Sequence, residues 1–523
     1  MFRRSVPRCH ALLLAAASAT SLAWFAAGPA SAQSFTCTDS FRAPSGSWDN
    51  TGNWTTGIPS PSSNSCIGAN GVTVTSAGTD NTYDLFIGSG DTLNNSQGGV
   101  YVYGTKVDND GSIALNGALL RFSQNATLDG GGTIQMTGGL VGQQGSNVTL
   151  DNVNNLIIGT GIVGFNGLSL VNEAQGTVIA SGGALSLNGG GSITNYGTLE
   201  VGAGATMHLS GGAFENFSGN TLTGGTYAVS STNTRAGVLL IEQLGTSGGE
   251  IVNNDASILL SGANSNFTDA NGNNALSNFS RNESGGSFTI ISGRNFATAD
   301  AGNFINAGNV TIGATSKMSI GSAAQNNYVQ SGGTTQVDGT LAANNASING
   351  GTLQGTGNLT LNALMNYGVV KPGDATGSPG TLSITGNFGQ GSTGTLDIEI
   401  GGTHSGQYGQ LDISGTANLG GTLAVNLVKS FSLAMGEKFD ILNAGVDLGD
   451  FSAFDFDGQG CTSGPGDTWH CAGMGSMYFA ENFLRGGNEL ELDVVPEPGS
   501  LLLFGAGLLG MACFAFRRSQ KTI

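Results

Sequence analysis

The sequence predicts an all-β fold: a parallel β-helix (solenoid) with a β-rich C-terminal cap, followed by a single C-terminal transmembrane helix. Short runs of alternating or β-branched apolar residues recur along the chain and are bounded by Gly, Asn or Asp. An apolar–Asn–Gly motif precedes several of these runs. One longer apolar run lies close to the end of the chain.

The N-terminal segment 1–32 has the features of a secretory signal peptide. It begins with Arg3, Arg4 and Arg8, continues with an apolar stretch over 11–27, and ends in a small-residue site. We therefore expect cleavage between Ala32 and Gln33, and we exclude this segment from the fold.

Strand-length apolar segments follow from the N-terminal part to the C-terminal part of the mature chain. The clearest are 72–74, 100–102, 156–158, 177–179, 258–260, 289–291, 396–400 and 423–427. Glycine is abundant, at 89 of 523 residues, and ordering so much of it is costly, which would favour disorder. The regular recurrence of strand-like segments argues against disorder.

The Asn–Gly motif predicts a turn before each of five strands. It appears as VDNDG, LVNEAQG, ITNYG, FINAG and LMNYG, with its asparagine at Asn109, Asn172, Asn195, Asn306 and Asn366. Asn can hydrogen-bond its own turn and Gly supplies positive φ, so we expect these asparagines in turns. The spacing from Asn172 to Asn195 fits one coil of a solenoid, although other spacings differ.

Stacking of such coils would bury apolar residues that a single coil leaves exposed. In the third motif we expect Ile193 and Leu199 to be buried and Glu200, on the alternate face, to be exposed. A large antiparallel β-sandwich is the alternative, but it requires more Asn-Gly hairpin turns than the sequence has.

The end of the chain combines three features in order: Pro496-Glu497-Pro498, an apolar run over 501–516, and the basic residues Arg517 and Arg518. The run is just long enough to span a bilayer, and the arginines would lie on the cytoplasmic side. This tail resembles the PEP-CTERM sorting signal of exported bacterial proteins. The resemblance implies cleavage near the motif by an exosortase, with transient attachment to the inner membrane. An ordinary C-terminal membrane anchor is the alternative.

The charge of the mature chain argues against nucleic acid as a partner. Both ends together hold six of the 17 basic residues and one of the 35 acidic residues, Glu497, which leaves 11 against 34, a net charge near −23. Such a chain is soluble and attracts cations.

Four cysteines remain between the two processing segments, in two local pairs. We expect Cys37 to pair with Cys66 and Cys461 with Cys471, as suits an oxidising exported location. Metal binding is the alternative, but the sequence lacks CxxC and a His cluster, so we predict no metal site and no cofactor.

Two further segments resemble the passenger domains of autotransporter-like β-helix proteins. One is SGSWDNTGNWTTGIPSPSSNSCIGANGVTVT from Ser45, with Trp48 and Trp54 at the recurrent places; the other runs from Val369 to Leu442. Gln410 stands where such proteins usually have Asp, so no role of that Asp is transferred. The resemblance implies architecture but no reaction.

The predicted organisation is a signal peptide (1–32), a Trp-containing cap (33–79), the β-helix (80–384), a C-terminal β domain (385–495) and the sorting signal (496–523). We predict no catalytic residues. Asp397 and Glu399 share a strand face, which we expect to be solvent-facing. We therefore expect a non-enzymatic structural or adhesive protein of the cell surface, outer membrane or extracellular matrix, associated with extracellular polysaccharide in biofilm. A β-helix polysaccharide lyase or hydrolase is the alternative, because many such enzymes have this fold.

Overall fold

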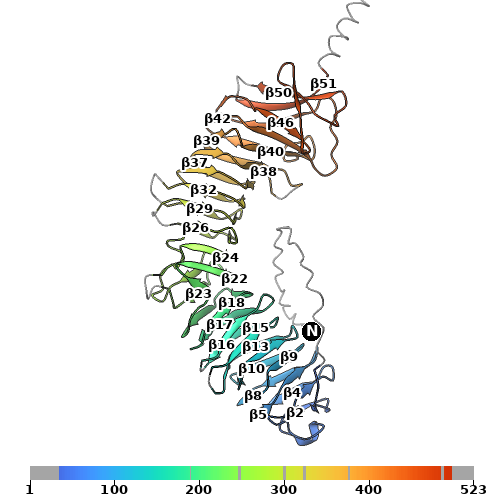
Figure 1. Cartoon of the computed structure of the whole chain (residues 1–523), viewed down its shortest axis with the longest axis vertical. Coiled ribbons are helices and arrows are strands. Elements are labelled where there is room, and N and C mark those ends of the chain that lie inside the picture. Colours follow the sequence, from blue (N-terminus) through green and yellow to red (C-terminus); the bar gives the residue numbers. More distant parts are fainter. Residues whose placement is uncertain are drawn as a thin grey trace, which may run out of the picture.

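The computed structural model describes residues 35–497 except 146, 166, 189, 245–248, 299–301, 322–325, 375–376 and 485–487. In this part, the regular structure consists of β-strands and one short 3₁₀ helix, η1 (Thr51–Asn53). The all-β prediction is confirmed. Figure 1 shows an elongated stack in which the strands follow sequence order from β2 near one end to β51 near the other.

The predicted transmembrane segment over 501–516 lies outside the described residues. Within the described residues, no helix has the length and apolar character needed to cross a bilayer.

One sheet has eight strands: β1 (Asp39–Ser40), β3 (Ser65–Ile67), β6 (Leu85–Ile87), β9 (Lys106–Asn109), β12 (Ala126–Asp129), β14 (Thr149–Asn152), β16 (Ser169–Asn172) and β18 (Ile193–Asn195). A second, larger sheet holds the other strands. Its N-terminal members are β2 (Ser45–Ser47), β4 (Thr73–Ser76), β5 (Thr79–Thr82), β7 (Thr92–Asn95), β8 (Gly99–Val102), β10 (Ser112–Asn116), β11 (Leu119–Phe122), β13 (Thr133–Gln143), β15 (Leu156–Phe165), β17 (Thr177–Asn188), β19 (Thr198–Val201), β20 (Thr206–Ser210), β21 (Phe217–Ser218), β22 (Thr221–Ser230) and β23 (Gly237–Ile241).

Its central members are β24 (Asn253–Ser261), β25 (Ser265–Thr268), β26 (Arg281–Asn282), β27 (Ser287–Ile291), β28 (Asn295–Ala297), β29 (Phe304–Asn306), β30 (Asn309–Ile312), β31 (Lys317–Ser319), β32 (Tyr328–Gln330), β33 (Thr334–Val337), β34 (Thr340–Ala342), β35 (Asn345–Ile348), β36 (Thr352–Gly355), β37 (Asn358–Asn366), β38 (Val369–Pro372) and β39 (Thr381–Gln390). Its C-terminal members are β40 (Thr395–Ile400), β41 (Gln410–Ile413), β42 (Thr416–Asn418), β43 (Thr422–Leu427), β44 (Lys438–Asn443), β45 (Val446–Leu448), β46 (Ala453–Phe456), β47 (Gln459–Gly460), β48 (Thr462–Gly464), β49 (Thr468–His470), β50 (Met477–Leu484) and β51 (Glu489–Pro496).

Most strands pair in parallel with a strand one coil earlier and another one coil later. Thr352 pairs with Val369, whereas Thr226 pairs with Ser257, a partner almost twice as far along the chain. The coils therefore vary in length, which explains why the Asn–Gly spacing in the sequence is irregular. This parallel pairing also crosses the predicted domain boundaries at 79/80 and 384/385, as in the pairs β4–β7 and β39–β41.

Inward-facing residues form continuous columns because the coils stack in register. One column of successive Cα partners contains Val74, Leu93, Ile113, Ile134, Ile157, Val178, Leu199, Tyr227, Ile258, Phe288, Val310, Thr335, Leu353, Val370, Leu396, Leu423 and Phe454. All of them are buried. Its one hydroxyl-bearing aliphatic member, Thr335, donates to Gln330 Oε1 at 2.6 Å. The inward-facing side chains of each coil thus cover those of the coils before and after it, so that all of them are removed from water.

The burial predictions for the third motif are confirmed for its apolar residues. Ile193 is 2% exposed and Leu199 is fully buried. Glu200 does lie on the alternate face of the strand, but it is only partly exposed, and its partial burial raises the pKa of its carboxyl. The outward faces of neighbouring coils lie close enough together to shield one another from water.

The five motif asparagines lie at strand ends with their side chains buried, and three of them, Asn172, Asn195 and Asn306, belong to hydrogen-bonded ladders of asparagines. Asn152 Nδ2 donates to Asn172 Oδ1 at 2.8 Å, and Asn172 Nδ2 donates to Asn195 Oδ1 at 2.9 Å. A second ladder runs from Asn254 through Asn282 to Asn306, at 2.8 and 2.9 Å. Because buried amides need partners, identical amides at the same register satisfy one another from coil to coil.

Part of the turn hypothesis is confirmed and part is wrong. Asn306 and Asn366 accept bonds from the amides of Gly308 and Gly368 at 3.2 and 3.1 Å, so they do bond their own turns. The motif glycines, however, do not have positive φ. A Cβ on Gly308 would lie 2.2 Å from the carbonyl oxygen of Gly286 in the preceding coil. Glycine is needed here because adjacent backbones approach too closely for any side chain.

Replacing Asn172 by Ala should destabilise the protein by about 1–3 kcal/mol, because its ladder neighbours lose partners in a dry interior. Asn116→Ala is the matched control, since Asn116 is exposed and its amide donates only to Asn94 Oδ1 at 3.0 Å. Chemical denaturation measures both effects. Equal losses of stability in the two variants would contradict a structural role for the ladder.

The two ends of the stack are closed by contacts other than parallel strand pairing: a tryptophan pair at one end and antiparallel strands at the other. At the N-terminal end Trp48 and Trp54 are fully buried, with ring centroids 4.8 Å apart, and Trp54 Nε1 donates to the Trp48 carbonyl at 2.8 Å. At the C-terminal end, β51 pairs antiparallel with both β44 and β50. The edge of β44 is therefore covered, which prevents a further strand from adding there.

Candidate functional site

The sorting motif begins directly at the last strand of the fold. Pro496 is the final residue of β51 and pairs with Met477 of β50, and the Glu497 amide donates to the Ser476 carbonyl at 2.9 Å. The Glu497 side chain is exposed. The first two residues of the motif thus extend the terminal hairpin, with no described linker between hairpin and motif.

The remaining predicted processing residues lie outside the described residues. These are Pro498, Arg517 and Arg518 of the tail, and Ala32 and Gln33 at the expected signal-peptide cleavage site. Their roles stay predictions from the sequence.

The four mature cysteines form two disulfides in the structure. Cys37 is bonded to Cys66 with Cα atoms 5.7 Å apart, and Cys461 is bonded to Cys471 with Cα atoms 4.4 Å apart. The first joins the chain before β1 to β3, and the second joins the residue before β48 to the residue after β49 and so closes that hairpin.

Peptide mapping of the non-reduced mature protein should recover Cys37 linked to Cys66 and Cys461 linked to Cys471. Closing loops of 29 and 10 residues should stabilise the protein by roughly 2–4 kcal/mol each. Reduction should therefore lower the unfolding midpoint. Free thiols at all four positions in the native protein would contradict the pairing.

The carboxylates Asp397 and Glu399 do not form the solvent-facing pair that the sequence predicts. Glu399 is 3% exposed, and Lys371 Nζ lies 2.7 Å from its Oε1 while the Gly377 amide donates to its Oε2 at 2.9 Å. The segment after β38 covers it, which strand alternation alone cannot predict. Asp397 is partly buried, which raises the pKa of its carboxyl, and it accepts from Asn426 Nδ2 at 2.7 Å. With both oxygens of Glu399 engaged, this pair lacks the two open carboxylates that glycoside hydrolysis uses.

A different carboxylate pair, Asp338 and Asp374, is brought together by the fold from the chain that follows β33 and the chain that follows β38. Gln336 Nε2 donates to an oxygen of each, at 2.7 and 2.8 Å. Burial and the neighbouring Asp338 raise the pKa of Asp374 to about 6. The two carboxyls can therefore share one proton at a pH of about 6. No sequence signal identifies this carboxylate pair. The coils between the two residues have unequal lengths, so the spacing in the sequence does not reveal that Asp338 and Asp374 meet.

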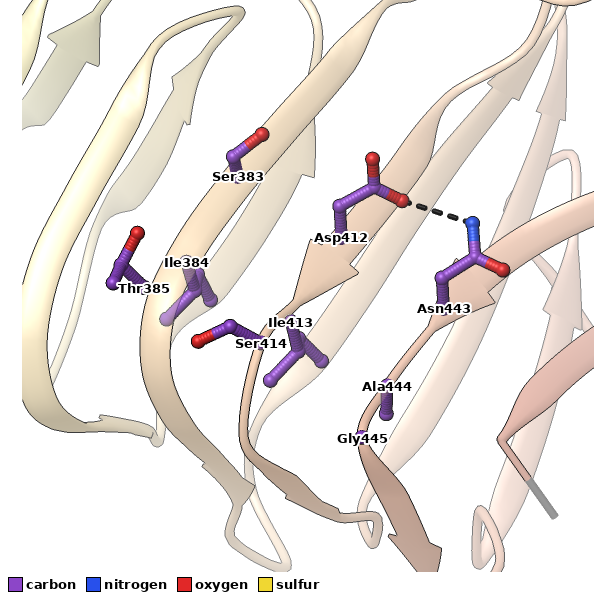
Figure 2. A pocket seen from close by; sticks show the side chains of 9 residues that line it. All are labelled: Ser383, Ile384, Thr385, Asp412, Ile413, Ser414, Asn443, Ala444 and Gly445. Atoms are coloured by element: carbon purple, nitrogen blue, oxygen red, sulfur yellow. Dashed lines mark hydrogen bonds between the residues drawn. The ribbon is translucent and has the colours of Figure 1, made fainter.

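The surface also has a shallow hollow of about 400 Å³ across β39, β41 and β44. Figure 2 shows Ser383, Asp412 and Asn443 in a row on adjacent coils, with Asn443 Nδ2 donating to Asp412 Oδ1 at 2.9 Å. Ser414 and Thr385 form a second edge. Hydroxyl, amide and carboxylate groups at the spacing of the coils can hydrogen-bond a polyhydroxylated ligand.

The described histidines do not gather at a site. His208 lies 3.7 Å from Glu242, His404 is exposed, and the ring of His470 lies 4.8 Å from that of Tyr478. Among the residues that the structure describes, no set of three or more His, Cys, Asp or Glu side chains is arranged to hold a metal ion.

Comparison with protein families identifies the end of the chain. Residues 494–519 match the model of the PEP-CTERM protein-sorting motif. This motif indicates a protein that is exported across the inner membrane and processed by an exosortase. Comparison with curated proteins gives no match.

Proposed function

We propose that this protein is a non-enzymatic structural or adhesive component of the cell surface or extracellular matrix. The observation that carries the proposal is the PEP-CTERM motif, which begins at the end of the last strand of an elongated stack. In this proposal the stack is a parallel β-helix of the autotransporter-passenger type, and it acts as a spacer that projects from the cell.

Extracellular polysaccharide is the proposed partner. The proposal is supported by the polar outward rows of successive coils, such as Asn358, Ser383, Asp412 and Asn443, which are Cα partners in sequence. Each such group makes a weak contact with a sugar hydroxyl, but rows repeated at a constant spacing suit a repeating polymer. Many weak contacts on one rigid rod sum by avidity.

A polysaccharide-cleaving enzyme is the second candidate, favoured by the half-buried Asp338 and Asp374 pair. Incubation of the mature protein with acidic and neutral glycans, followed by assays for reducing ends and unsaturated products, separates the two candidates. We expect no products. Product formation that is lost in Asp374→Asn would establish the enzyme instead.

Fractionation of wild-type and exosortase-deficient cells tests the proposed function. We expect the mature protein in the surface or extracellular fraction of the wild type, co-purifying with polysaccharide. In the deficient cells we expect the longer form in the inner membrane. An unchanged distribution and mass in the deficient cells would contradict exosortase processing, and enzymatic removal of the polysaccharide without release of the protein would contradict the proposed partner.

A further inference from the structure

The N-terminal end of the stack has a buried carboxylate at a position where the coils above have aliphatic side chains. Asp80 of β5 pairs with Val100 of β8, and the same column continues with Leu120, Val141, Val163, Leu187, Leu209 and Ile241. Asp80 is 1% exposed, as buried as the members of the column above it. An acidic residue at the head of an apolar column needs a compensating partner.

Neither carboxyl oxygen of Asp80 has a hydrogen-bond partner in the structure. Other buried acids at this end differ in this respect. Asp39 Oδ1 accepts from Thr55 Oγ1 at 2.9 Å and from the Thr56 amide at 3.0 Å, and Asp91 Oδ1 accepts from the Val72 amide at 2.8 Å. Among these buried acids, only Asp80 therefore lacks a donor on both oxygens.

The groups that approach Asp80 are oxygen donors of the kind that bind hard cations. The second carboxylate is that of Asp49, an exposed residue of the turn after β2, whose Oδ2 would lie 3.4 Å from a Cβ at Gly78. The third group is the hydroxyl of Ser76, the last residue of β4. Ser76 is fully buried, and its Oγ lies 3.5 Å from Asn95 Oδ1. Burial and the proximity of Asp49 raise the pKa of Asp80 to about 7, while Ser76 lowers it. No lysine or arginine of the described chain is among the groups that shift it.

We propose that Asp49, Ser76 and Asp80 form a binding site for a divalent cation of the calcium type, which closes the N-terminal end of the stack. Three chain segments converge there, and two carboxylates with a hydroxyl supply up to five oxygens. Calcium accepts six to eight oxygen ligands in irregular geometry, so backbone carbonyls or water would complete the shell. A site with two carboxylates fits the weak affinities of extracellular modules, on the order of 10⁻⁴–10⁻³ M.

Terbium luminescence of the mature protein tests the site directly, with Tb³⁺ as the calcium probe. Trp48, the chain neighbour of Asp49, is the residue whose excitation would sensitise the ion. We expect sensitised emission that excess Ca²⁺ displaces. Asp80→Asn and Asp49→Asn should weaken binding by roughly tenfold or more, because calcium affinity depends on ligand charge. Asp450→Asn is the matched control, since Asp450 is exposed and far along the chain, and it should bind as the wild type does.

Thermal unfolding separates cation binding from proton sharing between Asp49 and Asp80. The folded-state pKa of Asp80 lies above its ordinary value of 3.8, so its contribution to stability is present in acid and is lost as the pH rises toward about 7. In chelator, the wild type should therefore lose stability over this range, and Ca²⁺ should restore it at pH 7. Asp80→Val, which matches the rest of the column, should be stable in chelator and insensitive to Ca²⁺.

Two results would overturn the proposal. One is a wild-type unfolding midpoint at pH 7 that Ca²⁺ does not raise, since a pair that only shares a proton responds to pH and not to calcium. The other is Tb³⁺ emission that Asp80→Asn and Asp450→Asn reduce equally, since this would reflect general attraction to an acidic surface.

Discussion

Leu199→Asp should destabilise the protein by about 4 kcal/mol or more, which is the largest loss expected from a single substitution in the stack. Leu199 is fully buried between Val178 of the coil before and Tyr227 of the coil after. The substitution removes the apolar contacts of a leucine and introduces a charge that has no partner in the column. Because each coil contacts only its neighbours, the damage should be greatest in the coils of β17, β19 and β22. Hydrogen exchange should show amides there opening while distant coils stay protected.

Thr198→Asp is the matched control for this prediction. It places the same charge on the same strand, but Thr198 lies on the outward face and is partly exposed. The control should cost less than about 1 kcal/mol, as surface substitutions usually do. Comparable losses in both variants, or exchange that rises uniformly over the whole chain, would argue against a stack held together by local coil contacts.

Replacement of Pro496-Glu497-Pro498 by three alanines should abolish processing and leave the longer form in the inner membrane. The motif holds the polar recognition features next to the apolar run, and Glu497 is exposed at the end of β51. Intact-mass measurement of the protein from membrane and surface fractions checks this result. An unchanged mature mass in the variant would show that the motif is not the processing signal.

Met477→Ala controls for damage to the terminal hairpin. Met477 is the Cα partner of Pro496 in β50, so its truncation weakens the same end of the hairpin without changing the motif. We expect Met477→Ala to be processed normally. Loss of processing in both variants would mean that the folded hairpin, and not the motif, is what the protease requires.

The sequence predicts the strands well because apolar alternation is a local signal. Each of the eight segments expected to be strands lies wholly or largely in one, for example 156–158 in β15 and 396–400 in β40. The burial of the Ile193 and Leu199 side chains follows from the same alternation. The number of residues between two paired strands, by contrast, differs from coil to coil. No local signal specifies this number.

The features that the sequence misses depend on this long-range register. The motif asparagines predict turns, but their inward stacking becomes visible only when Asn172 is placed between Asn152 and Asn195. Recurrence of Asn at the same strand end is the signal that could have indicated a ladder. Likewise, the burial of Glu399 depends on the segment after β38, and the approach of Asp49 to Asp80 depends on a turn closing the end of the stack.

Small-angle X-ray scattering of the mature protein tests the stacked, elongated fold most directly. The column from Val74 to Phe454 has sixteen steps, and at about 4.8 Å per step it alone spans roughly 75 Å. A compact domain of the same length would have a radius of gyration of about 23 Å. We expect a clearly larger radius and an asymmetric distance distribution with a long tail. A symmetric distribution with the radius of such a compact domain would contradict the stack and the role as a projecting spacer.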